Sequence, residues 1–305
     1  MPSIAHRISL IAMKTGTLYI VATPIGNLAD LTIRASETLG SVDLIAAEDT
    51  RRTRKLLNHL GIRKRMVSYR EENRAKAARE IISSIQTGHS TALVTDAGTP
   101  GLSDPGHYLV QKALESDIRV VPVPGVSALA AALSVSGLPL DRFMFEGFLP
   151  ARQASRRRRL LELAATGYPM IIYESPRRIQ ATLSDLLDVL EDRNVVVARE
   201  MTKLHEEFLR GPASEVLKDL NARDLKGEIT LLVAGGKPPS LPMELDRAVK
   251  TMREEGLSAK KTASILGDLT GENRQTIYKL AAEIAAPTER PGDRATGKKG
   301  DKRKR

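Results

Sequence analysis

The chain of 305 residues contains no cysteine and no tryptophan, and aromatic residues make up only 3% of it. The absence of cysteine excludes disulfides, thiolate zinc sites and a cysteine nucleophile, and it is typical of a reducing compartment such as the cytoplasm. The five histidines are scattered without an H-x-x-x-H spacing, so we expect no metal site. The shortage of aromatic residues argues against a sheet that stacks RNA bases on aromatic rings.

Long apolar runs are also absent. No segment approaches the roughly 18 to 20 apolar residues that a membrane-spanning helix needs, so we expect no membrane association. Residues 1–16 hold only a short, broken apolar patch and no good cleavage site. They are predicted to be a disordered extension, neither signal peptide nor anchor. Regular patterning begins at Thr17, so Met13 is an alternative start to Met1.

Positive charge is what the chain has in excess. The formal net charge of +10 favours a polyanionic partner. Eight cationic and three acidic residues follow Pro287 and leave a charge of +5 there, so residues 286–305 are predicted to be a basic disordered tail. Solvation alone explains such a tail, but the sign of its charge favours nucleic acid over an acidic protein.

Strand-like and helix-like segments alternate along most of the chain. The apolar runs that predict strands are 17–23, 43–48, 92–95, 119–123, 143–146, 170–174, 195–200 and 229–234. Alternation of this kind predicts an α/β protein in which helices cover largely buried sheets. We expect two α/β/α layered domains, 17–123 and 124–236, with the boundary near P-V-P-G at 122–125.

The composition changes after residue 234. The run G-G-K-P-P-S-L-P at 235–242 is typical of a linker, and helical patterns follow at 243–255, 258–266 and 272–285 around the turn G-D-L-T-G at 267–271. Residues 243–285 therefore predict a helix-turn-helix-like domain with Arg274, Gln275 and Lys279 facing outward. A helical bundle that only packs against its neighbours is an equally good interpretation.

The loop V-T-D-A-G-T-P-G-L-S-D-P-G at 94–106 follows a strand and matches neither G-x-G-x-x-G nor G-x-x-x-x-G-K-[ST]. Gly98 and Gly101 permit a ligand to approach backbone amides, and Asp96 is placed to accept hydrogen bonds from a ribose or an ammonium group. Ser103 is expected to cap the following helix. Because ligands bind beyond the carboxyl ends of strands in open α/β sheets, we expect a binding loop, the alternative being a tight structural turn.

Three other strand ends have the same character. T-P-I-G-N-L (23–28) follows the first strand, and P-G-V-S-A (124–128) opens a helix of small residues on which a flat ring can pack. Y-E-S-P-R-R (173–178) is expected to start a helix. Arg177 and Arg178 would then lie in a first turn whose dipole disfavours positive charge. This cost indicates an anionic partner, the alternative being two arginines on a solvated turn.

These motifs together resemble a known family. T-L-Y-I-V-A-T-P-I-G-N-L, A-A-E-D-T-R, T-D-A-G-T-P-G-L-S-D-P-G, S-G-L-P-x-x-x-F-x-F-E-G-F-L-P, Y-E-S-P and R-E-M-T-K are similar to the bacterial 16S ribosomal RNA cytidine 2′-O-methyltransferases of the tetrapyrrole-methylase superfamily. The resemblance covers about 13–236 closely, and 243–285 also fits that family's C-terminal domain. It departs at Arg177, Arg70 and Glu72, near which the family has histidines, so it does not support a mechanism that needs them.

The resemblance implies two α/β domains that bind S-adenosylmethionine in the cleft between them, commonly as a homodimer. It implies methylation of the ribose 2′-hydroxyl of a cytidine in the decoding centre (P site) of 16S rRNA, in the small ribosomal subunit, by a cytoplasmic enzyme. Its cofactor contacts, carried onto this chain, are Pro24, Asp96, Ala97, Gly98, Ser103, Ser127, Ala128, Tyr173 and Thr230.

A ribose hydroxyl is a weak nucleophile, so its attack on a sulfonium methyl group needs alignment and a proton acceptor. We expect Glu200 and Lys203 to be catalytic. Asp49 and Arg51, together with Arg177 and Arg178, are expected to bind substrate. The alternative is that these charged residues form a structural ion-pair network.

RNA contacts are also expected from the run Arg156 to Arg159. Four consecutive arginines on a helix spread about 100° apart, which suits wrapping around RNA, although a solvated helix start is the alternative. Two rival functions remain. One is methylation of a tetrapyrrole or another small molecule on the same fold, against which the basic tail and D-A-G-T-P, in place of a porphyrin-type G-G-D-P, argue. The other is a non-catalytic nucleic-acid-binding protein.

Overall fold

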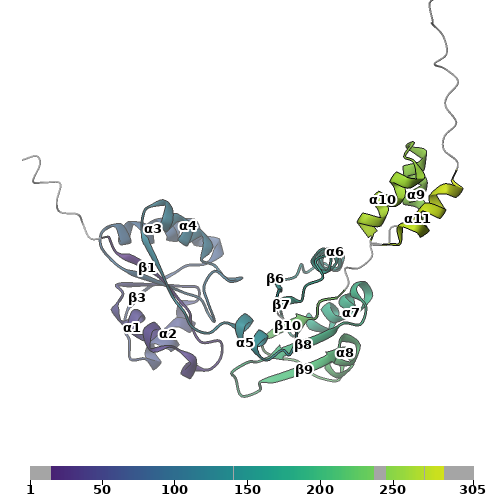
Figure 1. Ribbon diagram of the computed structural model, residues 1–305. Helices are drawn as coiled ribbons and strands as arrows, with labels where there is room; N and C mark the ends of the chain where they lie inside the picture. The colour runs from purple at the N-terminus through teal and green to yellow at the C-terminus, as the bar shows by residue number, and fades with distance from the viewer. Residues whose placement is uncertain (1–14, 140, 237–244, 271, 285–305) are drawn as a thin grey trace, which may run out of the picture. The chain divides into compact units, whose positions relative to one another are not determined.

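The computed structural model describes residues 15–139, 141–236, 245–270 and 272–284 (Figure 1). The chain divides into two compact units, residues 1–238 and residues 239–305. The predicted tail 286–305 lies outside the described residues, and so does the predicted extension 1–16 except for residues 15 and 16. In the described part no helix combines the length and the apolar character that crossing a membrane requires.

The first sheet is entirely parallel and has the order β3-β2-β4-β1-β5. Its strands are β1 (Thr17–Val21), β2 (Leu44–Ala47), β3 (Arg65–Ser68), β4 (Thr91–Val94) and β5 (Arg119–Val123). The central strands β2 and β4 are buried at every residue, because helices cover both faces of a parallel sheet.

Four helices form these two covering layers, with α1 and α2 on one side of the sheet and α3 and α4 on the other (Figure 1). They are α1 (Ile33–Ser41), α2 (Thr50–His59), α3 (Arg74–Gln86) and α4 (His107–Glu115). Leu39 and Leu57 belong to one core cluster, and Ile81 and Leu109 to the other. Each helix therefore buries one apolar stripe against its own face of the sheet.

The second sheet is mixed. It has the order β6-β7-β10-β8-β9, and only the β6–β7 pair is parallel. Its strands are β6 (Met144–Phe148), β7 (Met170–Glu174), β8 (Asn194–Arg199), β9 (Glu207–Pro212) and β10 (Ile229–Val233). The pairing of β6 with β7 shifts register between Phe145 and Gly147, and Gly147 has a φ of +72°, which favours glycine at this irregularity.

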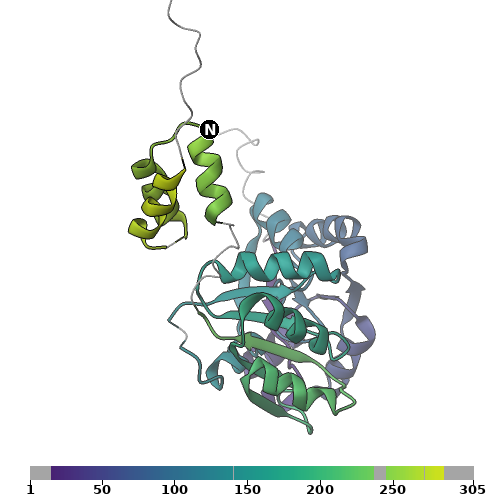
Figure 2. The same cartoon turned by 90° about the vertical axis from the view of Figure 1, so that its right-hand side faces the viewer.

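The two faces of the second sheet are covered differently. Helices α6 (Gln153–Ala164), α7 (Ile179–Leu190) and α8 (Ala213–Asn221) pack on one face, and in Figure 2 they lie in teal to green across the front of the strands. The opposite face packs against α5 (Ala128–Ser134) and against Ile25 and Ala97 from loops of the first domain. Loops of the first domain thus meet the second sheet directly.

The second unit is a three-helix cluster of α9 (Leu245–Glu254), α10 (Ala259–Thr270) and α11 (Arg274–Glu283) around Leu266 and Ile277. The predicted turn at 267–271 is wrong for residues 267–270, which continue α10. A Cβ on Gly267 would lie 2.5 Å from Cγ of Arg274, so glycine permits the close approach of α11. Residue 271 and the predicted helical residues 243, 244 and 285 lie outside the described residues.

The predicted fold class, α/β with a C-terminal helical region, is confirmed, and the two sheets lie on either side of the proposed boundary at 122–125. Strands β3 and β9 were not predicted. Each is an edge strand with little continuous apolar sequence, and β9 ends in Gly211 and Pro212. Edge strands are partly exposed, which weakens their apolar pattern.

Candidate active site

The loop after β4 is fixed to the loop after β1. Gly98 and Thr23 exchange two backbone hydrogen bonds, each 2.9 Å long, and Gly98 has a φ of +77°. Both polar backbone groups of Gly98 are therefore used within the protein. Glycine is required here by the left-handed turn.

Ser103 is not the predicted helix cap. Helix α4 begins at His107, its N-cap residue is Gly106, and no side chain caps it. Ser103 points elsewhere: a Cβ on Gly147 would lie 2.5 Å from Oγ of Ser103. The side chain thus packs on the irregularity of β6, which joins the loop after β4 to the second sheet.

A cavity of about 270 Å³ opens beside these loops. Residues of the loop after β4 line it together with residues from α5 and from the ends of β7 and β10. It contains six of the nine predicted cofactor residues, namely Ala97, Gly98, Ser127, Ala128, Tyr173 and Thr230. The Tyr173 ring meets the rings of Phe145 and Phe148 edge-on, with centroids 5.0 Å and 5.8 Å apart. One wall is therefore aromatic, and the small residues of α5 leave room for a flat group.

A second cavity of about 260 Å³ shares Ile25, Ala97 and Glu228 with the first. It contains the predicted cofactor residues Pro24 and Asp96, whereas Ser103 lines neither cavity. The second cavity is also lined by three cationic side chains, Arg52, Lys55 and Lys203. Sequence reasoning named only the last of these, because the run T-R-R-T-R-K of α2 does not show which of its cations face a cavity.

Three carboxyl groups line the first cavity: Asp104, Glu174 and Glu228. Glu174 accepts hydrogen bonds of 2.8 Å from the hydroxyl of Thr182 and the amide of Ser175, and its Oε1 lies 3.3 Å from Nε of Arg178. Burial raises the pKa of Asp104 to about 7, and the negative charges of nearby acidic residues add to this effect. Sequence reasoning did not single out Asp104, because the D-P step looks like ordinary turn composition.

Glu200 and Lys203 form an ion pair, and Lys203 lines the second cavity. Nζ of Lys203 lies 2.7 Å from Oε1 of Glu200 and 3.0 Å from Oε2 of Glu228. Burial raises the pKa of Glu200, but hydrogen bonds from Lys203 and from the amide of Glu228 outweigh it and leave that pKa lowered. Burial likewise lowers the pKa of Lys203, and its two carboxylate partners outweigh that and leave it raised. Both groups are held in their charged forms, and Glu200 lines neither cavity.

Asp49 and Arg51 begin α2. Asp49 caps the helix by accepting a hydrogen bond of 2.8 Å from the amide of Arg51, and its own amide donates to Oδ1 of Asp96 at 3.1 Å. The hydrogen bond from Arg51 lowers the pKa of Asp49. The side chain of Arg51 is 87% exposed, whereas Arg52 reaches Oδ2 of Asp96 at 3.3 Å. Arg52 therefore connects the start of α2 to the loop after β4.

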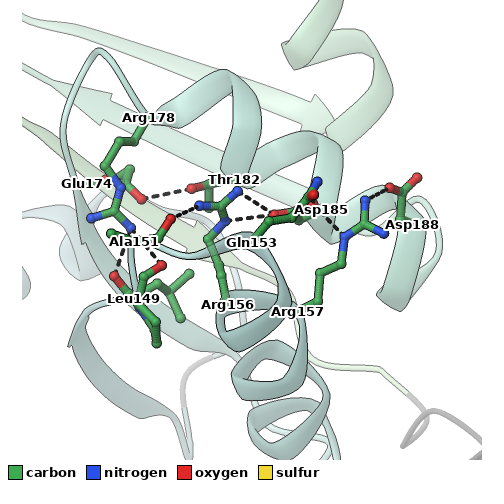
Figure 3. Close-up of polar contacts among 11 residues, drawn as sticks. Leu149, Ala151, Gln153, Arg156, Arg157, Glu174, Arg178, Thr182, Asp185 and Asp188 are labelled. Atoms are coloured by element: carbon green, nitrogen blue, oxygen red, sulfur yellow. Dashed lines mark hydrogen bonds and ion pairs between the residues drawn. The ribbon is translucent and has the colours of Figure 1, made fainter.

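Helix α7 begins at Ile179, three residues later than Pro176, where the sequence predicts its first turn. The expected place of Arg177 and Arg178 in the first turn is therefore wrong, because Arg178 is the N-cap residue and Arg177 precedes it. Arg177 is exposed. The guanidinium of Arg178 donates to the carbonyls of Leu149 and Pro150 at 2.8 Å and 3.2 Å, so it braces the loop after β6 (Figure 3).

The arginine run on α6 is bound inside the second domain (Figure 3). Arg156 is only 5% exposed and its Nε donates to the fully buried Asp185 at 2.7 Å. Arg157 pairs with Asp185 and Asp188. Arg159 makes two hydrogen bonds of 2.7 Å to Glu146. The expectation that these arginines wrap around RNA is wrong for the buried Arg156. Arg157 and Arg159 are partly exposed and held by acidic residues of neighbouring elements, whereas Arg158 is 77% exposed.

The described residues contain no group of three or more histidine or carboxylate side chains that would hold a metal ion. Three kinds of similarity to known proteins bear on the site: a family profile, two curated relatives and one solved structure. The profile of a family described as Tetrapyrrole (Corrin/Porphyrin) Methylases matches residues 17–217, which include every residue of the two cavities except Gly227, Glu228, Ile229 and Thr230.

Two curated relatives carry the name Ribosomal RNA small subunit methyltransferase I. The one from Synechocystis sp. is 45% identical over 276 residues, which are 89% of this chain and 99% of that protein. The one from Escherichia coli O157:H7 is 46% identical over 275 residues, 88% and 95% of the two chains. A uroporphyrin-III C-methyl transferase from Thermus thermophilus, solved with S-adenyl homocysteine, is 18% identical and has a TM-score of 0.53 over 72% of this chain and 97% of that one. At that identity the likeness is one of fold.

Proposed function

Because this chain belongs to the tetrapyrrole methylase family, we propose that it transfers a methyl group from S-adenosylmethionine to the ribose 2′-hydroxyl of a decoding-centre (P-site) cytidine in 16S rRNA. The observation that carries the proposal is the identity of 45% and 46%, over nearly their whole length, to two proteins named as small-subunit rRNA methyltransferases. That similarity supports methylation of small-subunit rRNA. The cytidine and its 2′-hydroxyl are the finer step, which rests on the motif resemblance.

The first cavity fits the methyl donor. Its aromatic wall around Tyr173 and the small side chains of Ala97 and Ala128 suit a planar base, and its carboxyl groups suit a positively charged sulfonium. When bound there, S-adenosylmethionine supplies an activated methyl group. Gly98, Ser127 and Thr230 would hold it together with Pro24 and Asp96 from the second cavity, and Ser103 would act through its contact with β6.

The second cavity suits the target nucleotide. Lys55 lines it as a cation for a flanking phosphate, next to Arg52, which pairs with Asp96. The exposed Arg51 and Arg177 would bind further phosphates. Asp49 fixes the start of α2, and Arg178 fixes the wall of the first cavity. Lys203 and Glu200 remain candidates for positioning the substrate, since their pairing keeps both charged. The protein would act in the cytoplasm on 16S rRNA or the small subunit, as a homodimer.

The proposal is tested by ribose-methylation mapping of small-subunit RNA from cells with and without the gene, followed by transfer from labelled S-adenosylmethionine to purified RNA. One ribose methyl group on a 16S cytidine that disappears without the gene is expected. Methyl groups found only on bases, or no change, would contradict the proposal.

A substitution in the first cavity tests cofactor binding directly. Ser127 has an extended backbone with a φ of −138°, so Ser127→Leu fills the cavity without straining the chain. It is expected to weaken S-adenosylmethionine binding at least tenfold in calorimetry. Ser134→Leu, on the exposed end of the same helix, is the matched control and is expected to bind normally. Equal affinities in both variants would show that the donor binds elsewhere.

A further inference from the structure

The three carboxyl groups that line the first cavity differ in their partners. Glu174 is held by Arg178 and by two hydrogen bonds, and Glu228 is held by Lys203 at 3.0 Å. Among residues 15–139, 141–236, 245–270 and 272–284, Asp104 forms no ion pair. It is the one acidic side chain of that cavity, within this part of the chain, that no cation holds.

The surroundings of Asp104 are negative. Glu48, Asp96 and Glu228 all act on it through their charges, and a hydrogen bond from Thr95 acts in the opposite sense. The cations nearby are already used, since Arg52 pairs with Asp96 and Lys203 pairs with Glu228. From the cavity side Tyr173 faces it: burial raises the pKa of that phenol, and the charge of Asp104 raises it further. Asp104 is thus a half-buried carboxyl group among like charges at the surface of a binding cavity.

We propose that Asp104 is the proton acceptor of the methyl transfer. Its carboxyl group gives up a proton when the positively charged donor enters the cavity, and its carboxylate then takes the proton of the attacking ribose hydroxyl. The proposal rests on the proposed function, because it needs a hydroxyl nucleophile. It replaces Glu200, which lines neither cavity and is occupied by Lys203 and by the amide of Glu228.

The step is balanced in atoms and charge. The hydroxyl oxygen forms a bond to the methyl carbon as the bond from that carbon to sulfur breaks, and the electron pair of the broken bond stays on sulfur. The hydroxyl proton moves to Asp104. One positive and one negative charge are lost together, so the cavity returns to the charge that it had before the donor entered.

The negative charges around Asp104 make its proton affinity change in the course of the transfer. Before binding, burial and three neighbouring acidic groups keep the pKa of Asp104 near 7. A positive charge in the cavity favours the ionised form. As that positive charge disappears during transfer, the acidic neighbours again favour the protonated form. The proton affinity of Asp104 therefore rises as the hydroxyl becomes acidic, which is what an efficient general base requires.

Calorimetry on the intact protein tests the first half of the proposal. S-Adenosylmethionine and S-adenosylhomocysteine carry the same amino and carboxyl groups and differ in the charge on sulfur. Titration at pH 7 in buffers of different ionisation enthalpy gives the protons released on binding. The expected difference between the two ligands is about half a proton, because a group with a pKa near 7 is half protonated there. Equal proton release for both ligands would overturn the proposal.

Asp104→Asn tests the second half. It is expected to abolish the difference in proton release, to bind S-adenosylhomocysteine within a few fold of the original protein, and to lose about 10²–10⁴-fold in turnover. The acidic limb of the pH–rate profile near neutrality should disappear with it. Asp104→Glu keeps the acceptor and is expected to recover part of the turnover. Turnover within threefold for Asp104→Asn would overturn the proposal, and so would the loss of S-adenosylhomocysteine binding in a folded variant.

The matched control is Asp117→Asn. Asp117 is exposed, lies at the end of α4 and has a φ of +53°, a conformation that asparagine accepts readily. Normal proton release and turnover are expected. The two proposals fail separately: no ribose methylation by the original protein overturns the proposed function, whereas ribose methylation that survives Asp104→Asn overturns only the role of Asp104.

Discussion

The arginine run of α6 and the lysines of α10 and α11 carry the same charge and have opposite environments. Arg156 and Arg157 are held by the buried Asp185, and Arg159 is held by Glu146. Lys260, Lys261 and Lys279 are exposed, and within the described ranges none of the three forms an ion pair. The arginine run is the denser cluster of positive charge in the sequence, and it is therefore the one whose charge acidic side chains already neutralise.

The difference teaches that a cluster of cations marks a nucleic-acid surface only when the fold supplies no acidic partner. Helix α7 places Asp185 and Asp188 one turn apart, facing α6 (Figure 3). A buried pair of this kind costs much when one partner is removed, because the other charge is left without compensation. Replacing an exposed lysine changes the stability of the protein little, so the effect of the replacement should appear in RNA binding.

The largest expected effect follows from removing the buried acid. Asp185→Asn keeps the shape of the side chain but leaves Arg156 and Arg157 without a negative charge, and it should lower the free energy of unfolding by about 3–5 kcal/mol. Denaturant melts followed by circular dichroism measure this. Asp188→Asn, whose side chain is 49% exposed, is the control and should cost under about 1 kcal/mol. Equal costs would show that α6 and α7 do not depend on this pair.

The same pair predicts a dependence on pH. Burial raises the pKa of Asp185, but hydrogen bonds from Arg157, Gln153 and Arg156 outweigh it and leave the pKa below the usual value. The resulting stabilisation is fully present above the unfolded pKa of about 4 and is lost as the pH falls through the lowered value. Stability should therefore fall more steeply below pH 4 in the original protein than in Asp185→Asn.

A smaller effect is expected from removing the second unit. Deletion of 241–305 should leave S-adenosylmethionine affinity intact, because every residue of the two cavities precedes Val233. RNA affinity should fall and depend less on salt, by about 0.7–0.9 in log–log slope for each phosphate that the shortened chain no longer neutralises. Deletion of 287–305 alone should produce part of the change. Identical slopes for all three chains would exclude RNA binding by these residues.

The smallest effects come from single exposed cations. Replacing Lys260, Lys261 and Lys279 by glutamine should reduce the slope by up to about 0.9 for each lysine that touches a phosphate. Arg158→Gln removes an exposed charge from α6, whose nearest acidic partner, Glu162, is 3.8 Å away, and should change the free energy of unfolding by under about 0.5 kcal/mol. If Arg158→Gln changed the salt dependence of RNA affinity more than the lysine replacements do, the comparison between α6 and the second unit would be reversed.

Much of the fold could be predicted because its central strands are buried on both faces. L-I-A-A of β2 and T-A-L-V of β4 read as continuous apolar runs. Strand β3, R-M-V-S, is half-exposed at an edge and its pattern is too short to stand out. Helix α10 was cut short at Gly267, since sequence alone does not distinguish a glycine that ends a helix from one that admits a neighbouring side chain.

The site was predictable where its residues belong to loops of unusual composition. Gly98 and Ser127 were found in this way, the motif resemblance added Ala97, and all three line the first cavity. Asp104 and Arg52 were missed, because their importance comes from neighbours distant in sequence, such as Glu48 and Glu228 for Asp104. The pairing of Arg156 and Arg157 was missed for the same reason, because their partner Asp185 lies 29 and 28 residues away.

Two glycines make room for the ion pair between Glu200 and Lys203. A Cβ on Gly26 would lie 2.5 Å from Cγ of Lys203, and one on Gly227 would lie 2.2 Å from Cδ of Glu200. The amide of Asn27 also donates to Oγ1 of Thr202 at 3.1 Å. The loop after β1 is therefore latched to the segment after β8 by this hydrogen bond, and the ion pair between Lys203 and Glu228 latches that segment to the residues before β10. Such a latch makes the rate of ligand entry sensitive to ionic strength even for an uncharged ligand, because salt weakens the latch rather than the ligand's attraction.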